Sequence, residues 1–150
     1  MSKKLKSFVA SFACVGFLPG APGTWGSVAA YLAFEAAGRP LGLGGWAALG
    51  GILLVGCWSA SGAKEVFGSH DPAAVVIDEV AGMWLAFLVA GSQALWALGA
   101  AFVLFRIFDI AKPFPVCRLE KIGGWAGIMA DDLMAGALAG ALVRLLIHIS

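Results

Sequence analysis

The chain has 150 residues, of which 61% are hydrophobic and 13% are charged. A soluble domain carries about 25% charged and about 45–50% apolar residues, so this composition excludes an ordinary soluble domain. We expect an all-α integral membrane protein in which residues 1–150 form a single compact domain. The formal net charge of +1 gives no reason to expect nucleic-acid binding.

About five main helices, several of them short, are predicted in a multi-pass bundle. An apolar segment over residues 5–17 follows a basic start and is too short for an ordinary span, so we expect an interfacial or re-entrant segment. A Pro- and Gly-rich stretch ends it, and Thr24 is expected to cap the N-terminus of the first main helix. The main helices are predicted over residues 24–37, 46–66, 74–90, 94–111 and 129–149.

Residues 80–105 have the composition of one very long span, but the acids at its ends argue for a hairpin. In a straight helix, Asp78 and Asp109 would lie roughly 46 Å apart, on opposite faces of a membrane. Gly91-Ser-Gln93 offers a break between them. A hairpin that turns there would bring both acids to the same face at similar height.

The hairpin also sorts the basic residues. With Thr24 placed on the cytoplasmic side, Arg39 falls in an outer loop and Arg144 within a helix. The other eight of the ten basic residues fall on the inner side, as the positive-inside rule expects: Lys3, Lys4, Lys6, Lys64, Arg106, Lys112, Arg118 and Lys121. Glu35 and Arg144 would reach similar depth, so we expect them to pair and to close the bundle.

Five carboxylates stand at the margins of the apolar runs: Asp78, Glu79, Asp109, Asp131 and Asp132. Taken singly, acids at a helix start favour the helix dipole, and Asp109 can pair with Arg106 or Lys112 one turn away. Taken together, charges in lipid are costly unless they are paired, hydrated or bound to metal. We therefore predict that the five meet at one divalent-metal site. Oxygen ligands without histidine suit Mg²⁺.

Basic residues near these acids are predicted to form an anion-binding rim. The rim comprises Arg106, Lys112, Arg118 and Lys121, although attraction to anionic lipids also explains basic residues on this face. Thr24 and Ser27 lie at a glycine-flanked helix start, which either caps the helix or adds contacts to a phosphate. A metal surrounded by acids and cations is the equipment of phosphoryl transfer.

Four motifs follow one another over residues 19–136: Pro19-x-Ala21-Pro22-Gly-Thr-Trp-Gly-Ser27, Asp71-Pro-x-x-Val-Val-Ile-Asp78-Glu79-Val-Ala-Gly82-Met, Phe105-Arg106-x-Phe-Asp109-Ile-x-Lys112-Pro113-x-Pro115 and Gly127-Ile-Met-x-Asp131-Asp132-x-x-Ala-Gly136. Together they resemble the motif set of the phosphatidylglycerophosphatase A family. The resemblance implies Mg²⁺-dependent hydrolysis of phosphatidylglycerophosphate to phosphatidylglycerol and phosphate. It also implies a bacterial inner-membrane protein, and we place its site on the cytoplasmic side.

On these grounds each candidate residue has an expected role. The metal ligands are sought among Asp78, Glu79, Asp109, Asp131 and Asp132, with either member of each adjacent pair able to bind. Catalytic roles are expected for Asp78, Asp109 and Asp131, with water or a carboxylate as the nucleophile. Substrate phosphate is expected to contact Thr24, Ser27, Arg106 and Lys112.

Other chemistries are less well supported. None of the three cysteines (Cys14, Cys57 and Cys117) begins a Cys-x5-Arg sequence, which speaks against a thiol phosphoenzyme. A phosphatidyl-group transferase is the alternative enzyme, but its D-x-x-D-G-x-x-A-R signature is absent from the chain. A cation carrier would need its acids near the bilayer midplane rather than beside a basic rim.

Overall fold

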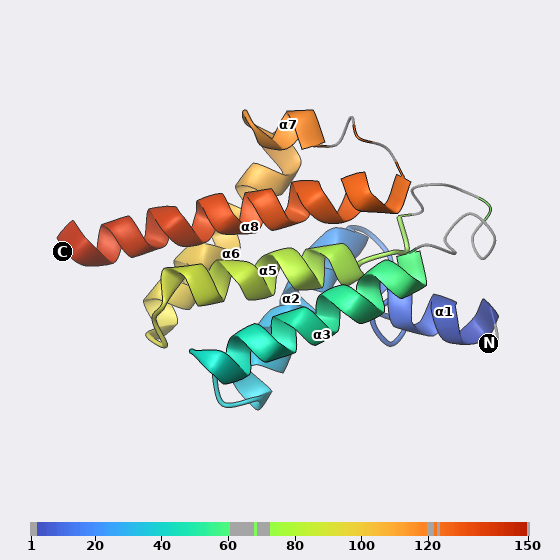
Figure 1. Cartoon of the computed structure of the whole chain (residues 1–150), viewed down its shortest axis with the longest axis horizontal. Coiled ribbons are helices and arrows are strands. Elements are labelled where there is room, and N and C mark those ends of the chain that lie inside the picture. The colour runs from blue at the N-terminus through green and yellow to red at the C-terminus, as the bar shows by residue number, and fades with distance from the viewer. Residues whose placement is uncertain (1–2, 61–67, 69–72, 120–121, 123, 150) are drawn as a thin grey trace.

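The computed structural model describes residues 3–60, 68, 73–119, 122 and 124–149 (Figure 1). The described residues contain helices and no strand, so the all-α prediction is confirmed. In chain order the elements are α1 (Lys3–Ala10), the 3₁₀ helix η1 (Val15–Phe17), α2 (Pro22–Ala36), α3 (Leu43–Ala60), α5 (Ile77–Ala90), α6 (Leu95–Ala111), α7 (Val116–Leu119) and α8 (Gly124–Ile149).

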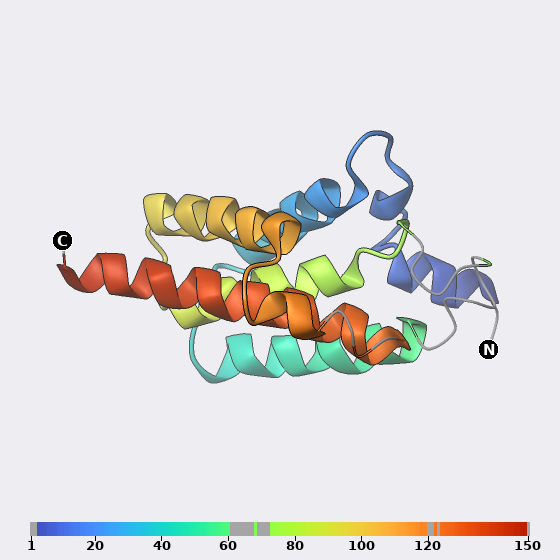
Figure 2. The same ribbon diagram turned by 90° about the horizontal axis from the view of Figure 1, so that it is seen from above.

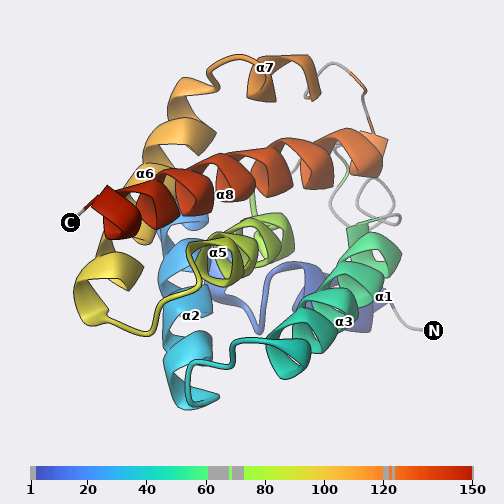
Figure 3. The same cartoon turned by 60° about the vertical axis from the view of Figure 1, so that its left-hand side comes forward.

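Helix α5 is the centre of the fold. Eleven of its fourteen residues are buried, because α2, α3, α6 and α8 all pack around it (Figure 3). Seen from above, α3 lies on one side of the molecule and α2 and α6 lie on the other, with α5 and α8 between them (Figure 2). A helix that is apolar on every face is expected to take such a position.

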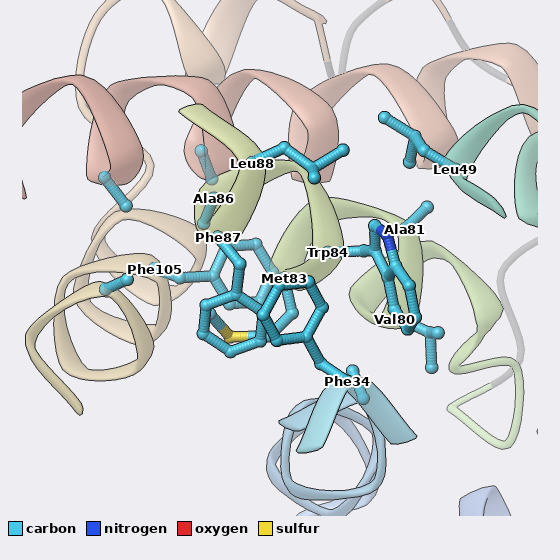
Figure 4. Close-up of a cluster of buried hydrophobic side chains, with 14 of the residues drawn as sticks. Phe34, Leu49, Val80, Ala81, Met83, Trp84, Ala86, Phe87, Leu88 and Phe105 are labelled. Atoms are coloured by element: carbon cyan, nitrogen blue, oxygen red, sulfur yellow. The ribbon is translucent and has the colours of Figure 1, made fainter. Parts of the chain in front are cut away.

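The core is built from aromatic side chains of α5 and its neighbours (Figure 4). Phe34 of α2 packs edge-on against Trp84, with ring centroids 5.1 Å apart, and lies 4.7 Å from Phe87. Phe105 of α6 is fully buried in the same cluster. The indole nitrogen of Trp84 donates a hydrogen bond to the carbonyl of Gly45 at 3.2 Å, so this buried polar group is satisfied.

The predicted hairpin is confirmed. Helix α5 ends at Ala90, and Gly91 adopts the left-handed conformation with φ 66° that closes a helix C-terminus. Helix α6 begins four residues later at Leu95 and runs back. The start of α5, which carries Asp78, and the end of α6, which carries Asp109, therefore lie toward the same end of the molecule, as do the starts of α2 and α8 (Figure 1).

Two predicted helix starts are wrong in an instructive way. Helix α2 begins at Pro22, so Thr24 is inside the helix instead of at its cap; proline's fixed φ suits the first helical position. Helix α8 begins at Gly124, which places Asp131 and Asp132 about two turns into the helix. Met129, which directly follows the added residues, is buried beside Gly56 of α3, so this end of α8 packs against α3.

The other helix bounds that the structure describes differ from the predicted ones by at most three residues. Helix α3 begins at Leu43 rather than at residue 46, and its predicted end falls in 61–67, outside the described residues. Helix α5 begins at Ile77, three residues after the predicted start. Lys64 and Lys121, assigned to the inner side, also lie outside the described residues.

The N-terminal segment forms α1 and then a tight reversal. Phe12, Ala13 and Cys14 all have positive φ before η1 begins. The carbonyl of Ala10 accepts a hydrogen bond of 2.9 Å from the backbone N–H of Val76, next to the start of α5. This contact fastens the basic N-terminal helix near the acid-bearing end of α5.

The predicted pair of Glu35 and Arg144 is wrong. Glu35 accepts a hydrogen bond of 2.8 Å from Arg39, whose positive φ folds the chain back over the end of α2. Arg39 also donates to the carbonyl of Gln93 at 2.7 Å, and the Gln93 amide donates to the Arg39 carbonyl at 2.8 Å. Arg144 is exposed on α8. A cation one turn away in the same segment therefore took the place of a partner on a distant helix.

Helix α8 is the described helix long and apolar enough to cross a membrane, with a candidate span over Ala126–Ile149. Helix α3 is similarly apolar over Leu43–Ser59 but shorter. This is compatible with a membrane protein.

Candidate active site

Three carboxylates from two helices meet at the end of the molecule where α5 begins. Asp78 and Glu79 belong to the first turn of α5, and Asp132 comes from α8. Each offers an oxygen, and these oxygens lie within 4.8 Å of one another. Asp78 is 7% exposed and Asp132 is 5% exposed, so the cluster is largely shielded from solvent. Its dimensions suit several ligands around one cation.

A close approach of two backbones brings these acids together. A Cβ atom added at Gly136 would overlap the carbonyl of Gly82, and one added at Gly82 would lie 2.5 Å from the carbonyl oxygen of Asp132. Asp78 precedes Gly82 by four residues, and Asp132 precedes Gly136 by four. Because residues four apart share a helix face, the glycine contact sets the two acids against each other one turn away.

Asp109 of α6 adjoins this cluster. Its side chain is close enough to Asp132 to share a hydrogen bond, and it is also paired with Arg106. Arg106 in turn lies beside Glu79: a Cβ atom added at Gly23 of α2 would contact the Glu79 carboxylate and would lie 3.2 Å from a guanidinium nitrogen of Arg106. Helices α5 and α6 therefore supply charged groups to this site beside Asp132 of α8, and α2 packs closely against two of them at Gly23.

Asp131 has a different partner from Asp132. Its carboxylate accepts a hydrogen bond of 2.9 Å from the ammonium group of Lys112, which lies in the left-handed conformation at the end of α6. Adjacent residues on a helix point about 100° apart, so the two aspartates face different neighbours. The expected convergence therefore takes the form of a three-acid cluster, with Asp109 beside it and Asp131 holding Lys112.

The cluster contains an unsatisfied oxygen. The Oε2 atom of Glu79 is buried and has no hydrogen-bond partner among the described residues. A buried carboxylate oxygen without a partner is costly, and a cation is the natural remedy. The donor set of Asp78, Glu79 and Asp132 is composed of oxygen atoms alone, which is the chemistry of hard divalent cations. The residues present therefore fit a metal of this class.

The two hydroxyl residues of α2 are placed differently. Ser27 is fully buried, and its hydroxyl donates to the carbonyl of Gly23 at 2.9 Å within its own helix. Thr24 is half-buried and lines a surface cavity together with Arg106. Of the two, Thr24 is the one that shares a surface with the basic rim.

Some residues of the site were not predicted. Gly23 was overlooked as a site residue, although its place between Pro22 and Thr24 in the first motif was a usable signal. The pairing of Lys112 with Asp131 spans nineteen residues and leaves no mark in the local sequence. Arg118 of α7, expected in the rim, lies over the ring of Phe114 at 4.8 Å.

Comparison with known proteins gives a consistent answer. The family model of phosphatidylglycerophosphatase A matches residues 8–147. Phosphatidylglycerophosphatase A of Haemophilus influenzae is 35% identical over 130 residues, covering 85% of this chain and 80% of the relative. The Escherichia coli K12 protein of the same name is 31% identical over 142 residues, covering 89% of this chain and 78% of the relative.

A third relative carries another name. A Bacteroides thetaiotaomicron protein, provisionally named a phosphatidylinositol-3-phosphatase, is 36% identical over 135 residues, covering 85% of this chain and 84% of the relative. No solved structure matches the chain. Since the family model covers nearly all of the sequence, and the relatives align over most of their length, the chain belongs to the phosphatidylglycerophosphatase A family and is a phosphatase.

Proposed function

We propose that this chain hydrolyses the terminal phosphate monoester of phosphatidylglycerophosphate, with Mg²⁺ as cofactor, to give phosphatidylglycerol and phosphate. Residues 1–150 would form one membrane-embedded phosphatase domain. It would lie in a bacterial inner membrane as a multi-pass protein, with its site on the cytoplasmic side.

The observation that carries the proposal is the three-acid cluster with its unsatisfied oxygen. Asp78, Glu79 and Asp132 would hold the ion, with Asp109 beside them. When bound, Mg²⁺ would supply Lewis-acid neutralisation of negative charge on the phosphate. Membership of the family supports the proposed reaction, and the oxygen-only donor set supports a hard cation as cofactor.

The cations beside the cluster are proposed to hold the substrate. Arg106 lies next to Glu79, and Lys112 is held by Asp131, so both lie at the border of the acids. Phosphate oxygens would contact these two side chains, with Thr24 as a secondary contact. We propose that Asp131 acts by positioning Lys112, and that Asp78 and Asp109 are the carboxylates nearest the reacting phosphate.

The membrane placement is supported by the exposed surface. Leu54 of α3 is 76% exposed, Ile110 of α6 is 72% exposed and Leu145 of α8 is 57% exposed. Exposed large apolar side chains recur along α3, α6 and α8, and an apolar surface of this extent is unusual for a soluble monomer and normal for a protein surrounded by lipid. Since the acids lie toward one end of the helices, the site would face a membrane surface rather than the bilayer midplane.

The names of the relatives suggest two candidate lipid substrates. Two relatives are named for phosphatidylglycerophosphate and one for phosphatidylinositol 3-phosphate. Both lipids carry a phosphate monoester, so the same acids and cations would serve either. We favour phosphatidylglycerophosphate because the family model itself is described by that activity.

The deciding experiment measures phosphate release by the detergent-solubilised protein from each lipid, with Mg²⁺ and with a chelator. We expect Mg²⁺-dependent release from phosphatidylglycerophosphate, and loss of that release in Asp132→Asn. Glu35→Gln, which removes an acid far from the cluster, serves as the matched control. Preferential hydrolysis of phosphatidylinositol 3-phosphate would show that this lipid is the substrate instead. Phosphate release unaffected by chelation would refute the proposed requirement for Mg²⁺.

Thermal unfolding provides a second readout that does not depend on turnover. A ligand that binds the folded state raises its stability by mass action. Mg²⁺ should therefore raise the Tm of the wild-type protein and of Glu35→Gln, but not that of Asp132→Asn. An equal rise in all three proteins would show that the ion binds elsewhere.

A further inference from the structure

A groove runs along the outer surface between α2 and α6, beginning beside the active site. We call it the α2–α6 groove. Thr24, Val28 and Tyr31 line it from α2, and Gly99, Val103 and Ile110 are among its residues from α6. The α2 residues are spaced by four and then three, so they share one face of the helix. Both helices lie on the same side of the molecule (Figure 2).

The groove consists of two adjoining cavities. The cavity near the active site has a volume of about 490 Å³, and the one farther from it has about 330 Å³. They share Phe102 and Val103 as lining residues, so they adjoin each other along α6. Each volume lies within the range of about 300–1,000 Å³ that is usual for small-molecule sites.

The groove is polar at one end and apolar along its length. Arg106 and Thr24 line the cavity near the active site, and Arg106 also lies beside Glu79 of the acid cluster. The Nε atom of Arg106 is buried and has no hydrogen-bond partner among the described residues. In the cavity farther from the active site the lining residues are apolar apart from Tyr31, and Val103 is 55% exposed. A cationic end joined to an apolar trough is complementary to an anionic lipid and its chain.

The length of the groove matches one leaflet. From Ile110 to Gly99, α6 rises about 16 Å at 1.5 Å per residue. The hydrocarbon core of a bilayer is about 30 Å thick, so half of it is about 15 Å. A lipid chain that starts at the phosphate end of the groove would remain in it for the depth of its own leaflet.

We infer that the α2–α6 groove binds an acyl chain of the substrate lipid, which enters laterally from the inner leaflet with its phosphate at Arg106. The inference rests on the proposed lipid phosphatase function and adds to it a specific lipid-entry route. Gly99 is central to it, because a Cβ atom added there would meet open space. The missing side chain leaves room for the lipid chain.

The first test fills the groove. Gly99→Trp should lower the ratio of kcat/KM for diacyl phosphatidylglycerophosphate to kcat/KM for the deacylated headgroup by about tenfold or more. Gly50→Trp on α3 is the matched control, because its Cβ also meets open space and it lines neither cavity of the groove. That control should keep the ratio within about twofold of wild type. An unchanged ratio in Gly99→Trp would overturn the inference.

The second test requires no turnover and no variant. Phosphatidylglycerophosphate with a photoactivatable group in one acyl chain is crosslinked to the wild-type protein in the presence of a chelator. Phosphatidylcholine with the same chain is the comparison probe. We expect the anionic probe to label peptides of α2 and α6 that line the groove, at Val28, Phe102 or Val103, well above the zwitterionic probe. Equal labelling by the two probes would indicate bulk lipid, and labelling elsewhere would indicate another route; both would overturn the inference.

The two tests also separate the inference from the proposed function. Hydrolysis of phosphatidylglycerophosphate without selective labelling of the groove would leave the function intact and refute the entry route. Selective labelling without hydrolysis would refute the proposed reaction while supporting the groove as a site for an anionic lipid.

Discussion

Gly23 occupies the point where the start of α2 meets two charged groups of the site. A Cβ atom at this position would press on the carboxylate of Glu79 and lie 3.2 Å and 3.3 Å from the two terminal nitrogens of Arg106. Both neighbours are the ends of flexible side chains, so they can move aside. Their movement would disturb the site more than the fold.

Gly23→Ala should therefore separate activity from stability. We expect kcat/KM for the lipid to fall by about tenfold or more, because Glu79 and Arg106 are displaced from their places. The Tm should change little, because alanine favours the helix over glycine by up to about 1 kcal/mol, and this gain offsets the cost of moving the two side chains. Gly50→Ala, in open space on α3, should retain activity. A large loss of Tm in Gly23→Ala would show that the backbone itself is crowded.

The charge of Lys112 can be removed with little change in the size of the side chain. Replacement by glutamine keeps most of the side-chain length and removes the charge that faces Asp131. We expect Lys112→Gln to raise KM for the lipid or abolish turnover, since a cation proposed to hold phosphate is lost. The Mg²⁺-induced rise in Tm should persist, because Lys112 is not a proposed ligand. Wild-type kinetics in Lys112→Gln would mean that the basic residues serve only to orient the protein in the membrane.

At the scale of elements, the pairing of α5 with α8 determines where the acids lie. Gly82 and Gly136 allow the two backbones to touch, and Gly140 continues the contact against the carbonyl of Ala86. Small residues spaced by four are the usual means of close helix packing in membranes. The same spacing relates the glycines to Asp78 and Asp132, so the contact that packs α5 against α8 also positions the acid cluster.

Gly136→Ala tests this relation. The added Cβ would overlap the carbonyl of Gly82, and neither backbone can yield without separating the helices. Overpacking of this kind costs about 1–3 kcal/mol, which corresponds to a fall in Tm of about 3–10 °C. Thermal unfolding in detergent measures it, with Gly50→Ala as the variant expected to lose no stability. Activity should fall as well, because Asp132 moves away from Asp78; a fully active, fully stable Gly136→Ala would contradict the glycine contact.

At the scale of the whole molecule, the two ends have different characters. The acids, Arg106 and Lys112 lie where α5 begins and α6 ends. At the far end, Arg39 and Gln93 exchange hydrogen bonds and join the loop after α2 to the loop after α5. In the proposed orientation the first end faces the cytoplasm and the second faces outward.

Labelling of single cysteines in a bacterial membrane would test that orientation. In a chain whose three native cysteines are replaced by serine, Ala94→Cys should react with an impermeant maleimide added outside spheroplasts, because Ala94 is exposed in the far loop. Phe114→Cys, at a position 69% exposed near the acids, should react only after the membrane is permeabilised. The reverse pattern would invert the proposed topology and place the site outside.

The helical class, the hairpin and the end of the molecule at which the acids gather could all be predicted from the sequence. These properties follow from local patterns: long apolar runs, the glycine and polar residues at 91–93, and the cost of leaving charges in lipid. The sequence also predicted that Asp78, Glu79, Asp109, Asp131 and Asp132 meet at one site, and it could not separate Asp132 from Asp131. The two aspartates are adjacent in the same apolar segment of the sequence, and the directions of their side chains depend on how α8 is rotated about its axis.

The partner of each charged side chain could not be predicted, because it depends on how the helices pack. The contact between Gly82 and Gly136 sets the rotation of α8, which turns Asp132 toward Asp78 and Asp131 toward Lys112. Glu35 pairs with Arg39 because a left-handed residue after α2 folds the chain back, which a helical projection of the sequence does not include. Side-chain partners depend on helix rotation and chain reversals, and these are set by packing between segments far apart in the sequence.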